Sequence, residues 1–367
     1  MELAARPVAM IRVHRGHHAI TWPAPSRVHR RNWRAPGPRA RPVLAPAADG
    51  CGRNAGAEPW NGRGRGAMAV ADAGSSGPGG IDRAAEVFMN VRPRLFGIAY
   101  RMLGSATEAE DLVQEVWLRW QGCDRAAVDN PAAFLATVTT RLAINAAQSA
   151  RVRRETYVGP WLPEPVDTSA DPHLGAERGE ALELAVLLLL ERLSPTERAA
   201  YVLREAFDYP YRQIADIVGL REAAVRQLVS RARRHVRAER RAPVTKAEQR
   251  RLLTAFVAAA RAGDLATLEE IFAADVVSYS DGGGAVRASR IPVVGASRVA
   301  KYVRAFASRF WTGVDVTWAS TNGQTSALLS RDGQVFAVVT VHVSEQGVDQ
   351  VLWMMNPAKI TAVRAVT

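Results

Sequence analysis

The chain has 367 residues, a formal charge of +12 and 48% hydrophobic residues, so two or three domains with real cores are expected. Its two cysteines, Cys51 and Cys123, exclude a disulfide framework and a cysteine-held zinc site, and they indicate a reducing compartment. The longest apolar run, residues 185–190, is far shorter than the ~20 residues of a membrane helix. The N-terminus lacks the apolar stretch of a secretory signal, so we expect a cytoplasmic protein without membrane contact.

Residues 1–80 form a basic tail without hydrophobic periodicity. They hold 12 arginines against 4 acidic residues, and 9 of the 20 prolines. Low hydrophobicity with high net charge is typical of disorder, so a disordered Arg/Pro/Gly-rich tail is predicted. Loose binding of nucleic acid is the alternative role for this tail.

Residues 81–155 are predicted to form an all-helical domain. Apolar positions between Leu95 and Leu103 predict a helix that ends at Gly104. Thr107 and Glu110 stand at capping-box spacing and predict the start of a second helix. Asn130-Pro131 has the pattern of an N-cap followed by the first residue of a third helix.

A linker is predicted over residues 156–180. It contains the sequence Gly-Pro-Trp-Leu-Pro-Glu-Pro at 159–165. Prolines at this density favour an extended path. A tryptophan in such a segment usually packs on another surface, so Trp161 is expected to dock.

The second helical domain is predicted over residues 181–241. Ser194 and Glu197 form a capping box with proline between them at the first helical position. A short helix over 211–218, a turn at Gly219 and a basic helix over 222–240 together indicate a helix-turn-helix.

The third domain is predicted over residues 247–367 and changes period. Helices over 247–262 and 264–273 come first, and apolar alternation begins at 275–280. A turn at Asp281-Gly282-Gly283-Gly284, a helix over 297–310 and three or four strands, including 334–343 and 348–355, follow. This pattern predicts an α+β domain with one curved antiparallel sheet.

The two helical domains resemble the conserved domains of an extracytoplasmic-function (group IV, sigma-70-type) RNA polymerase sigma factor. The residues that carry the resemblance are Leu95–Leu103, Ala109–Glu115, Asn130–Asn145, Leu193–Pro195, Tyr209–Ala215 and Glu222–Val236. The third domain resembles the SnoaL-like, cone-shaped α+β domain of the sigma-J-like subgroup. Three motifs fit that subgroup, and they are Trp161-Leu162-Pro163-Glu164-Pro165, Asp281–Gly284 and Asn356-Pro357-Ala358-Lys359-Ile360. The subgroup usually has lysine after the three glycines, where this chain has Ala285.

The resemblance implies a role for the polar face of the second helix. Asp111, Gln114 and Glu115 would bind the clamp helices of core RNA polymerase. A merely solvated helix face is the alternative interpretation of these residues.

The resemblance also implies that the third helix takes the −10 promoter element as a single strand. Stacking, base-edge hydrogen bonds and a basic groove serve such binding. The candidates are Arg141, Asn145, Gln148, Arg151, Arg153 and Arg154. An internal helix hydrogen bond by Asn145 and dipole compensation by the terminal arginines are the alternatives.

The basic helix of the helix-turn-helix is predicted to read the −35 element. Residues early in a recognition helix meet base edges in the major groove. Base contacts are expected from Arg226, Gln227, Ser230 and Arg231, and phosphate contacts from Arg233 and Arg234.

The third domain is expected to regulate the sigma domains in cis. Its candidate regulatory residues, with those of the linker, are Trp161, Pro163, Pro165, Asp281, Gly282, Gly283, Gly284, Asn356, Pro357 and Lys359. The segment from Asn356 to Ile360 is expected to touch the linker or the sigma domains. Asp281 is either a pocket acid or part of a simple turn, and His342 is expected in the core.

The chain is thus predicted to be a non-enzymatic initiation factor that binds core RNA polymerase and promoter DNA. No cofactor and no metal site are predicted, and a small-molecule ligand of the third domain is a further candidate partner. A stand-alone helix-turn-helix regulator and a cyclase or isomerase in the third domain are the alternatives.

Overall fold

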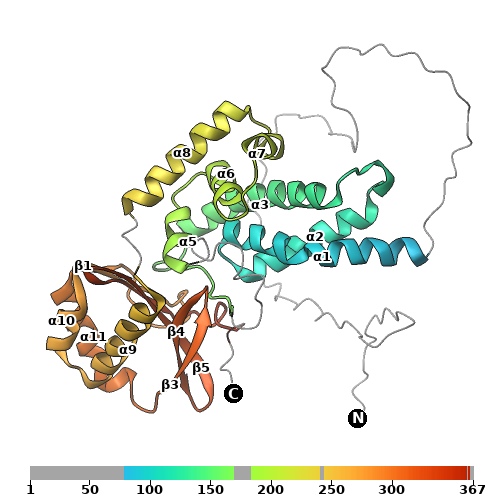
Figure 1. The fold of residues 1–367 in the computed structure, drawn as a ribbon. Coiled ribbons are helices and arrows are strands. Elements are labelled where there is room, and N and C mark those ends of the chain that lie inside the picture. Colours follow the sequence, from blue (N-terminus) through green and yellow to red (C-terminus); the bar gives the residue numbers. More distant parts are fainter. Residues whose placement is uncertain (1–77, 169–182, 240–243, 362, 364–367) are drawn as a thin grey trace, which may run out of the picture. The chain divides into compact units, whose positions relative to one another are not determined.

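The computed structural model describes residues 78–168, 183–239, 244–361 and Val363 (Figure 1). All of these residues fall within one of the two units of the chain, Arg63–Thr367. The predicted tail lies outside the described residues except for its last three, which begin the first helix. The predicted linker is described as far as Thr168.

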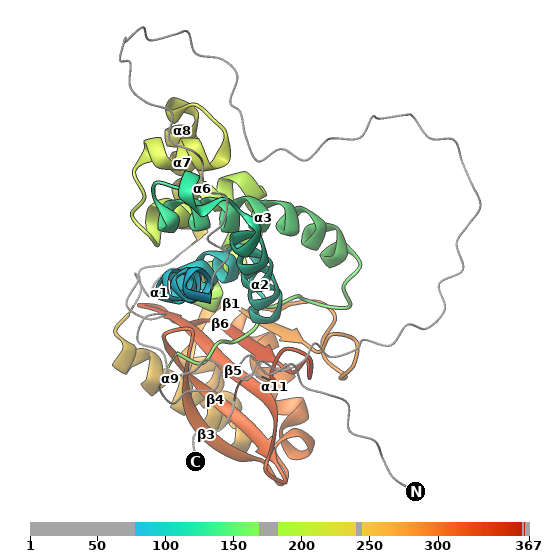
Figure 2. The ribbon, with the colours of Figure 1, turned by 90° about the vertical axis from the view of Figure 1, so that its right-hand side faces the viewer.

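The first helical region contains α1 (Pro78–Leu103), α2 (Ala106–Gly122), the short 3₁₀ helix η1 (Arg125–Ala127) and α3 (Pro131–Glu155). Figure 2 shows α1, α2 and α3 packed side by side. Their shared core includes Ile98, Val116 and Leu135, all inaccessible to solvent. The predicted cap of α3 is confirmed, because the Ala133 amide donates to the Asn130 side chain.

The predicted cap of α2 is wrong by two residues. Ser105 has an extended backbone and its Oγ accepts the Glu108 amide at 3.1 Å, so Ser105 is the N-cap. Thr107 already lies inside the first turn. Gly104 adopts φ +65° directly after α1, and this reversal brings Ser105, rather than Thr107, to the entrance of α2.

The second helical region contains α5 (Leu184–Leu190), α6 (Pro195–Glu205), α7 (Tyr211–Val218) and α8 (Glu222–Glu239). The predicted capping box of α6 is confirmed. The Glu197 amide donates to Ser194 Oγ, and the Ser194 amide donates back to the Glu197 carboxylate at 3.2 Å.

The C-terminal region begins with α9 (Lys246–Ala262) and α10 (Leu265–Ile271). It continues with β1 (Phe272–Asp281), β2 (Val293–Val294), α11 (Ala296–Phe310), β3 (Asp315–Thr321), β4 (Gln324–Arg331), β5 (Gln334–Ser344) and β6 (Gly347–Met354). The six strands form one sheet in the order β2-β1-β6-β5-β4-β3. The predicted α+β class is therefore confirmed.

The sheet is mixed, so the predicted all-antiparallel pairing is wrong at one position. Strands β3 to β6 form an antiparallel meander, but β1 and β6 run parallel. Between β1 and β6 the chain forms β2, α11 and strands β3 to β5. Strand β6 then lies beside β1 and runs in the same direction. Parallel neighbours require such a long connection, which alternation along single strands does not reveal.

The two faces of the sheet contribute to different cores. One face packs against α9, α10 and α11 (Figure 1). Phe256 and Phe310 each make an edge-to-face ring contact with Trp353 in this core. Trp353 is therefore a core residue, as predicted. On the other face, Leu328 and Leu352 belong to the same buried cluster as Leu162 of the linker.

Candidate functional site

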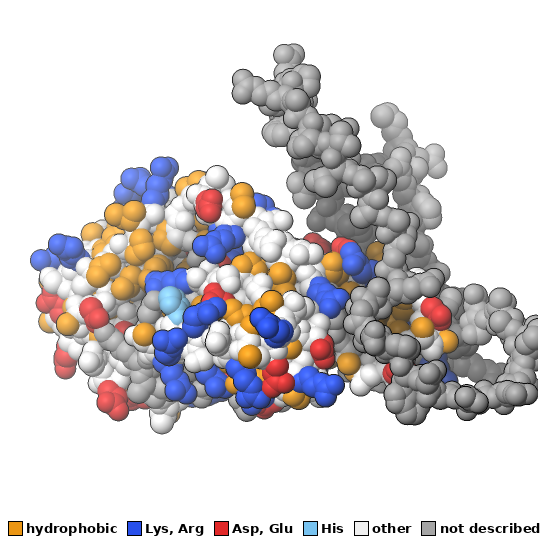
Figure 3. Space-filling view, turned by 90° about the horizontal axis from the view of Figure 1, so that it is seen from above, with side chains coloured by type: hydrophobic (Ala, Val, Ile, Leu, Met, Phe, Trp, Pro, Cys, Tyr) orange, Lys and Arg blue, Asp and Glu red, His pale blue; other side chains and the backbone are white. Residues whose placement is uncertain are grey.

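The helix-turn-helix is formed by α7 and α8 with the sharp turn that was predicted. Gly219 has φ +71° and ends α7, a left-handed conformation that glycine adopts without steric cost. Val225, Val229 and Val236 of α8 are buried. The opposite face of α8 exposes Arg226, Gln227, Ser230, Arg231 and Arg234, and Arg233 is half-buried. Figure 3 looks down on α7 and α8 and shows Lys and Arg side chains gathered over them.

Most candidate arginines of α8 are held by carboxylates. Arg226 pairs with Glu222 at 2.6 Å and lies over the Tyr211 ring, while Arg231 pairs with Glu197 at 3.3 Å. Arg233 pairs with Glu205 at 2.7 Å, and this hydrogen bond raises its pKa. These carboxylates orient the arginines along the exposed face of α8.

The candidate −10 residues of α3 divide into two groups. Asn145, Gln148 and Arg151 are exposed and stand at helical spacing on one stretch of α3. Arg141 instead donates to the backbone carbonyls of Asp216 and Ile217 at the end of α7. Arg153 pairs with Glu108 of α2 at 2.5 Å.

Arg154 is turned inward, away from the exposed candidates. It donates to the carbonyl of Leu103, pairs with Glu191 after α5, and stacks on the Trp161 ring at 3.5 Å from the centroid. Glu191 also pairs with the buried Arg198. Burial, followed by the nearby Arg198 charge, lowers the pKa of Arg154 to about 9. The predicted docking of Trp161 is thus explained by a cation–π contact.

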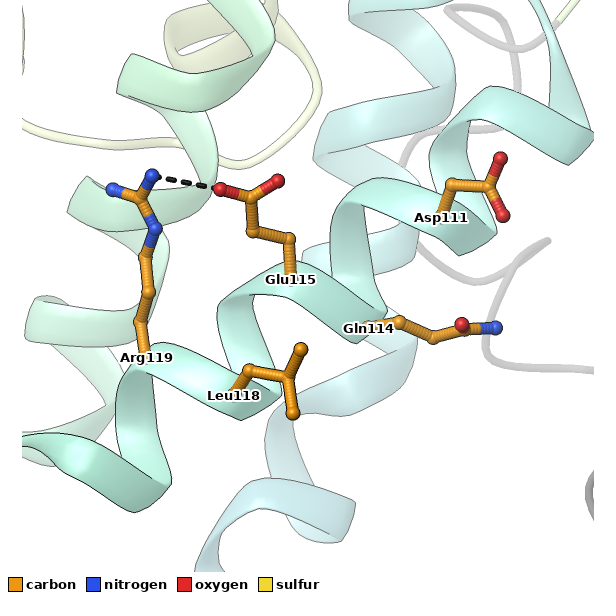
Figure 4. Close-up of a pocket in the computed structure, with 5 residues that line it drawn as sticks. All are labelled: Asp111, Gln114, Glu115, Leu118 and Arg119. Carbon is orange, nitrogen blue, oxygen red and sulfur yellow. Dashed lines mark hydrogen bonds and ion pairs between the residues drawn. The ribbon is translucent and has the colours of Figure 1, made fainter.

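The polar face of α2 forms a surface pocket. Asp111, Gln114, Glu115, Leu118 and Arg119 line it (Figure 4). Glu115 pairs with Arg119 at 2.7 Å, whereas Asp111 and Gln114 point away from that pair in Figure 4. Leu118, which the sequence analysis did not single out, is 66% exposed at this pocket.

Asp281 makes several of the contacts between the linker and the C-terminal region. Its side chain is fully buried, and its Oδ1 accepts from the Tyr157 hydroxyl at 2.6 Å and from the Gly283 amide at 3.1 Å. Its Oδ2 accepts from the Leu162 amide at 2.9 Å and from Lys359 Nζ at 2.8 Å. Asp281 is therefore more than a turn residue, because it binds the linker directly.

Lys359 and Asn356 complete this cluster, which we call the linker clamp and define as Tyr157, Leu162, Asp281, Asn356 and Lys359. Lys359 Nζ donates to the Leu162 carbonyl at 2.6 Å, and Asn356 donates to the Tyr157 hydroxyl at 2.8 Å. Burial lowers the pKa of Lys359 to about 8 despite the neighbouring carboxylate.

Other motif residues surround the linker clamp. Lys359 Nζ lies 4.2 Å from the Trp161 ring centroid. Pro163 and Pro165 are buried, and Pro357 is exposed. A Cβ on Gly283, which has φ +58°, would collide with the Asn356 side chain. The glycines therefore allow close packing of the turn against the Asn356 segment.

Glu164 anchors the other side of the linker, and the sequence analysis did not select it as a site residue. Its carboxylate accepts from Ser105 Oγ at 2.7 Å, the Ala106 amide at 2.8 Å and the Thr107 amide at 3.1 Å. Its own amide donates to the Gly104 carbonyl at 2.8 Å. Free amides at a helix N-terminus favour a carboxylate, so Glu164 caps α2 from outside the helix.

The predicted core position of His342 is confirmed, and the residue has a partner. Its Nδ1 lies 2.7 Å from Asp349 Oδ1, and both side chains are buried. Among the described residues, no group of three or more His, Cys, Asp or Glu side chains is placed to hold a metal ion. Within the same residues, no helix has the length and apolar character needed to cross a bilayer.

The fold combines a basic helix-turn-helix, an element typical of DNA-binding proteins, with a second helical module and a C-terminal α+β region. The sigma-70 region 2 family matches residues 87–153, and the sigma-70 region 4 family matches residues 183–236. The helix-turn-helix thus lies in region 4, and the α2 face and α3 lie in region 2.

Relatives from Mycobacterium tuberculosis agree with this class. The ECF RNA polymerase sigma factor SigJ is 37% identical over 62% of this chain and 74% of its own length. The probable ECF RNA polymerase sigma factor SigI is 31% identical over 75% of this chain and 93% of its own length. The crystal structure of SigJ superimposes with a TM-score of 0.63 at 31% identity, covering 77% of this chain and all of that one.

The chain belongs to the extracytoplasmic-function RNA polymerase sigma factors. It directs transcription initiation, and members of this family act with core RNA polymerase at promoter DNA. The resemblance of residues 247–367 to a SnoaL-like domain is consistent with the SigJ match.

Proposed function

We propose that three helices of this sigma factor bind core RNA polymerase and the two promoter elements, and that a further region regulates them. In this proposal α2 binds core RNA polymerase, α3 holds the −10 strand and α8 reads the −35 element. Residues 247–367 modulate these activities in cis through the linker. The protein acts in the cytoplasm, where core polymerase and promoters meet.

The observation that carries the cis regulation is the linker clamp. Asp281 and Lys359 of the C-terminal region bind both the amide and the carbonyl of Leu162. Two residues further on, Glu164 caps α2. A change in the C-terminal region is therefore transmitted through three consecutive linker residues to the helix proposed to bind polymerase.

The polymerase contact is supported by the composition of the α2 pocket. Asp111 and Gln114 offer hydrogen-bonding groups, and Leu118, further along α2, offers exposed apolar surface (Figure 4). A central apolar side chain surrounded by polar groups is typical of protein interfaces. Glu115 is oriented by Arg119, so its carboxylate is already positioned for a partner.

The −10 contact is proposed for Asn145, Gln148 and Arg151, which are exposed together on α3. Asn145 and Gln148 each carry a donor and an acceptor that suit base edges. Arg154 is assigned instead to the junction with Trp161 and Glu191. Arg141 can contact DNA only after its hydrogen bonds to the backbone carbonyls at the end of α7 are broken.

The C-terminal region is proposed to regulate rather than to catalyse. Its buried acid, Asp281, is saturated by two side chains and two backbone amides. A general acid or base needs access to a substrate, and these contacts leave Asp281 no such access. A small-molecule ligand of this region stays a prediction.

In-vitro transcription with core polymerase tests the initiation roles. We expect promoter-specific transcripts that depend on the chain, and the Asp111→Ala/Glu115→Ala variant should require a higher protein concentration for the same yield. The matched control is Asp82→Ala/Glu86→Ala, which removes two exposed carboxylates from α1. Equal behaviour of both variants would refute the α2 contact. DNA binding without any initiation would favour the stand-alone regulator.

A further inference from the structure

A second basic surface lies in the C-terminal region, apart from α3 and α8. The 33 residues between Asp281 and Asp315 contain no Asp or Glu. They contain six cations, which are Arg287, Arg290, Arg298, Lys301, Arg304 and Arg309. All six are exposed. Such a stretch produces a positive potential without internal compensation.

Four of these cations belong to α11 and share its outer face. At 3.6 residues per turn, Arg298, Lys301, Arg304 and Arg309 fall within an arc of about 140°. The opposite side carries Val299, Ala300 and Val303, which are buried against the rest of the region. We call the outer face, defined by the four cations, the α11 surface.

The α11 surface differs from α8 in how its charges are balanced. Three α8 arginines are paired with carboxylates. Within the part of the chain that the structure describes, the four α11 cations form no ion pair with a carboxylate. Helix α10 packs beside α11 and exposes Glu269 and Glu270, yet neither lies within pairing distance of an α11 cation. The charge of this surface is thus left for a partner.

We propose that the α11 surface binds the phosphate backbone of duplex DNA. The four cations extend over the twelve residues from 298 to 309, or about 16 Å of helix, and a duplex presents about one phosphate charge per 1.7 Å of its axis. Promoter DNA is the polyanion on which this family acts, so it is the charge-complementary partner that the function supplies. The contact reads no bases, because it consists of cations that bind phosphate.

The salt dependence of DNA binding tests this contact. Full-length protein and duplex promoter DNA would be titrated at several salt concentrations, and the slope of log affinity against log salt measured. The variant is Arg298→Gln/Lys301→Gln/Arg304→Gln, which keeps helix-forming side chains at exposed positions. If each cation neutralises one phosphate, the slope should become shallower by about 2.7. The affinity at low salt should fall for all DNA sequences alike.

The matched control is Lys246→Gln/Arg250→Gln/Arg251→Gln at the N-terminal end of α9. It removes the same charge from the same region, and Arg251 is already paired with Glu248. The proposal expects a slope change below 1 for this control. Equal slope changes in both variants, or none in the α11 variant, would overturn it. A loss of core-polymerase affinity with an unchanged DNA slope would assign the surface to an acidic protein instead.

Discussion

Lys359 and Asp281, 78 residues apart in the chain, form a buried ion pair at 2.8 Å, and both residues also hydrogen-bond to Leu162 of the linker. The pair thus has two roles. It joins the end of β1 to the segment after β6, because Asp281 is the last residue of β1 and Lys359 follows β6. It also fixes the linker by both backbone polar groups of one residue, the amide and the carbonyl of Leu162.

Breaking this pair on one side should be costly. Lys359→Met leaves the Asp281 carboxylate buried without its cation, and such losses typically cost about 3–5 kcal/mol of unfolding free energy. Asp281→Asn/Lys359→Met should cost less than the sum of the single changes, because both charges are removed. Chemical denaturation of the four proteins measures this coupling. Strict additivity would show that the two charges do not interact.

The same lysine predicts how stability depends on pH. Burial lowers its pKa to about 8, against 10.5 in an exposed lysine. Between these values the unfolded chain binds more protons than the folded chain, so Lys359 makes folding more favourable as pH rises. From pH 8 to 9.5 the gain should be about 2 kcal/mol. Denaturation at both pH values should show this gain in the wild type and lose it in Lys359→Met, and equal gains would contradict the assignment.

Glu164 should stabilise α2 as an external cap. Glu164→Ala removes its carboxylate contacts with Ser105 and the first amides of α2, which should cost about 1–2 kcal/mol. Thermal unfolding measures the loss. Glu155→Ala, which removes an exposed carboxylate at the end of α3, is the control and should be nearly neutral. Equal unfolding temperatures of the two variants would show that Glu164 does not stabilise α2.

Arg226 and Arg234 should affect DNA binding in different ways. Arg226→Ala should cost about 1–3 kcal/mol at the −35 element and relax its sequence preference, because early recognition-helix residues contact bases. Arg234→Ala should weaken binding to all sequences alike, as loss of a phosphate contact does. Competition between matched and scrambled −35 duplexes distinguishes the two. Unchanged selectivity in Arg226→Ala would remove it from base reading.

Local signals in the sequence predicted much of this fold. The capping box of α6, the cap of α3 and the glycine that ends α7 depend on neighbouring residues, so the sequence contains what each requires. The helix-turn-helix and the class of the C-terminal region followed from such signals. Motif resemblance led to Asp281 and Lys359.

Contacts between distant residues account for most of what was missed, and the cap of α2 is a local exception. Thr107 satisfied the capping pattern, but the reversal at Gly104 gave that role to Ser105. Arg154 matched a basic helix end, yet Trp161 and Glu191 draw it inward. The role of Glu164 and the parallel pairing of β1 with β6 also depend on segments that meet only in the folded chain.

Promoter-directed transcription by full-length variants of the linker clamp tests cis regulation most directly. Lys359→Met and the milder Tyr157→Phe, which removes the hydroxyl bound to Asp281 and Asn356, would be compared with the wild type and with Lys246→Met, an exposed control. We expect both clamp variants to change transcript yield in the same direction at equal protein and core polymerase concentrations, while the control matches the wild type. Equal yields from all four proteins would contradict control of initiation by the C-terminal region through the linker.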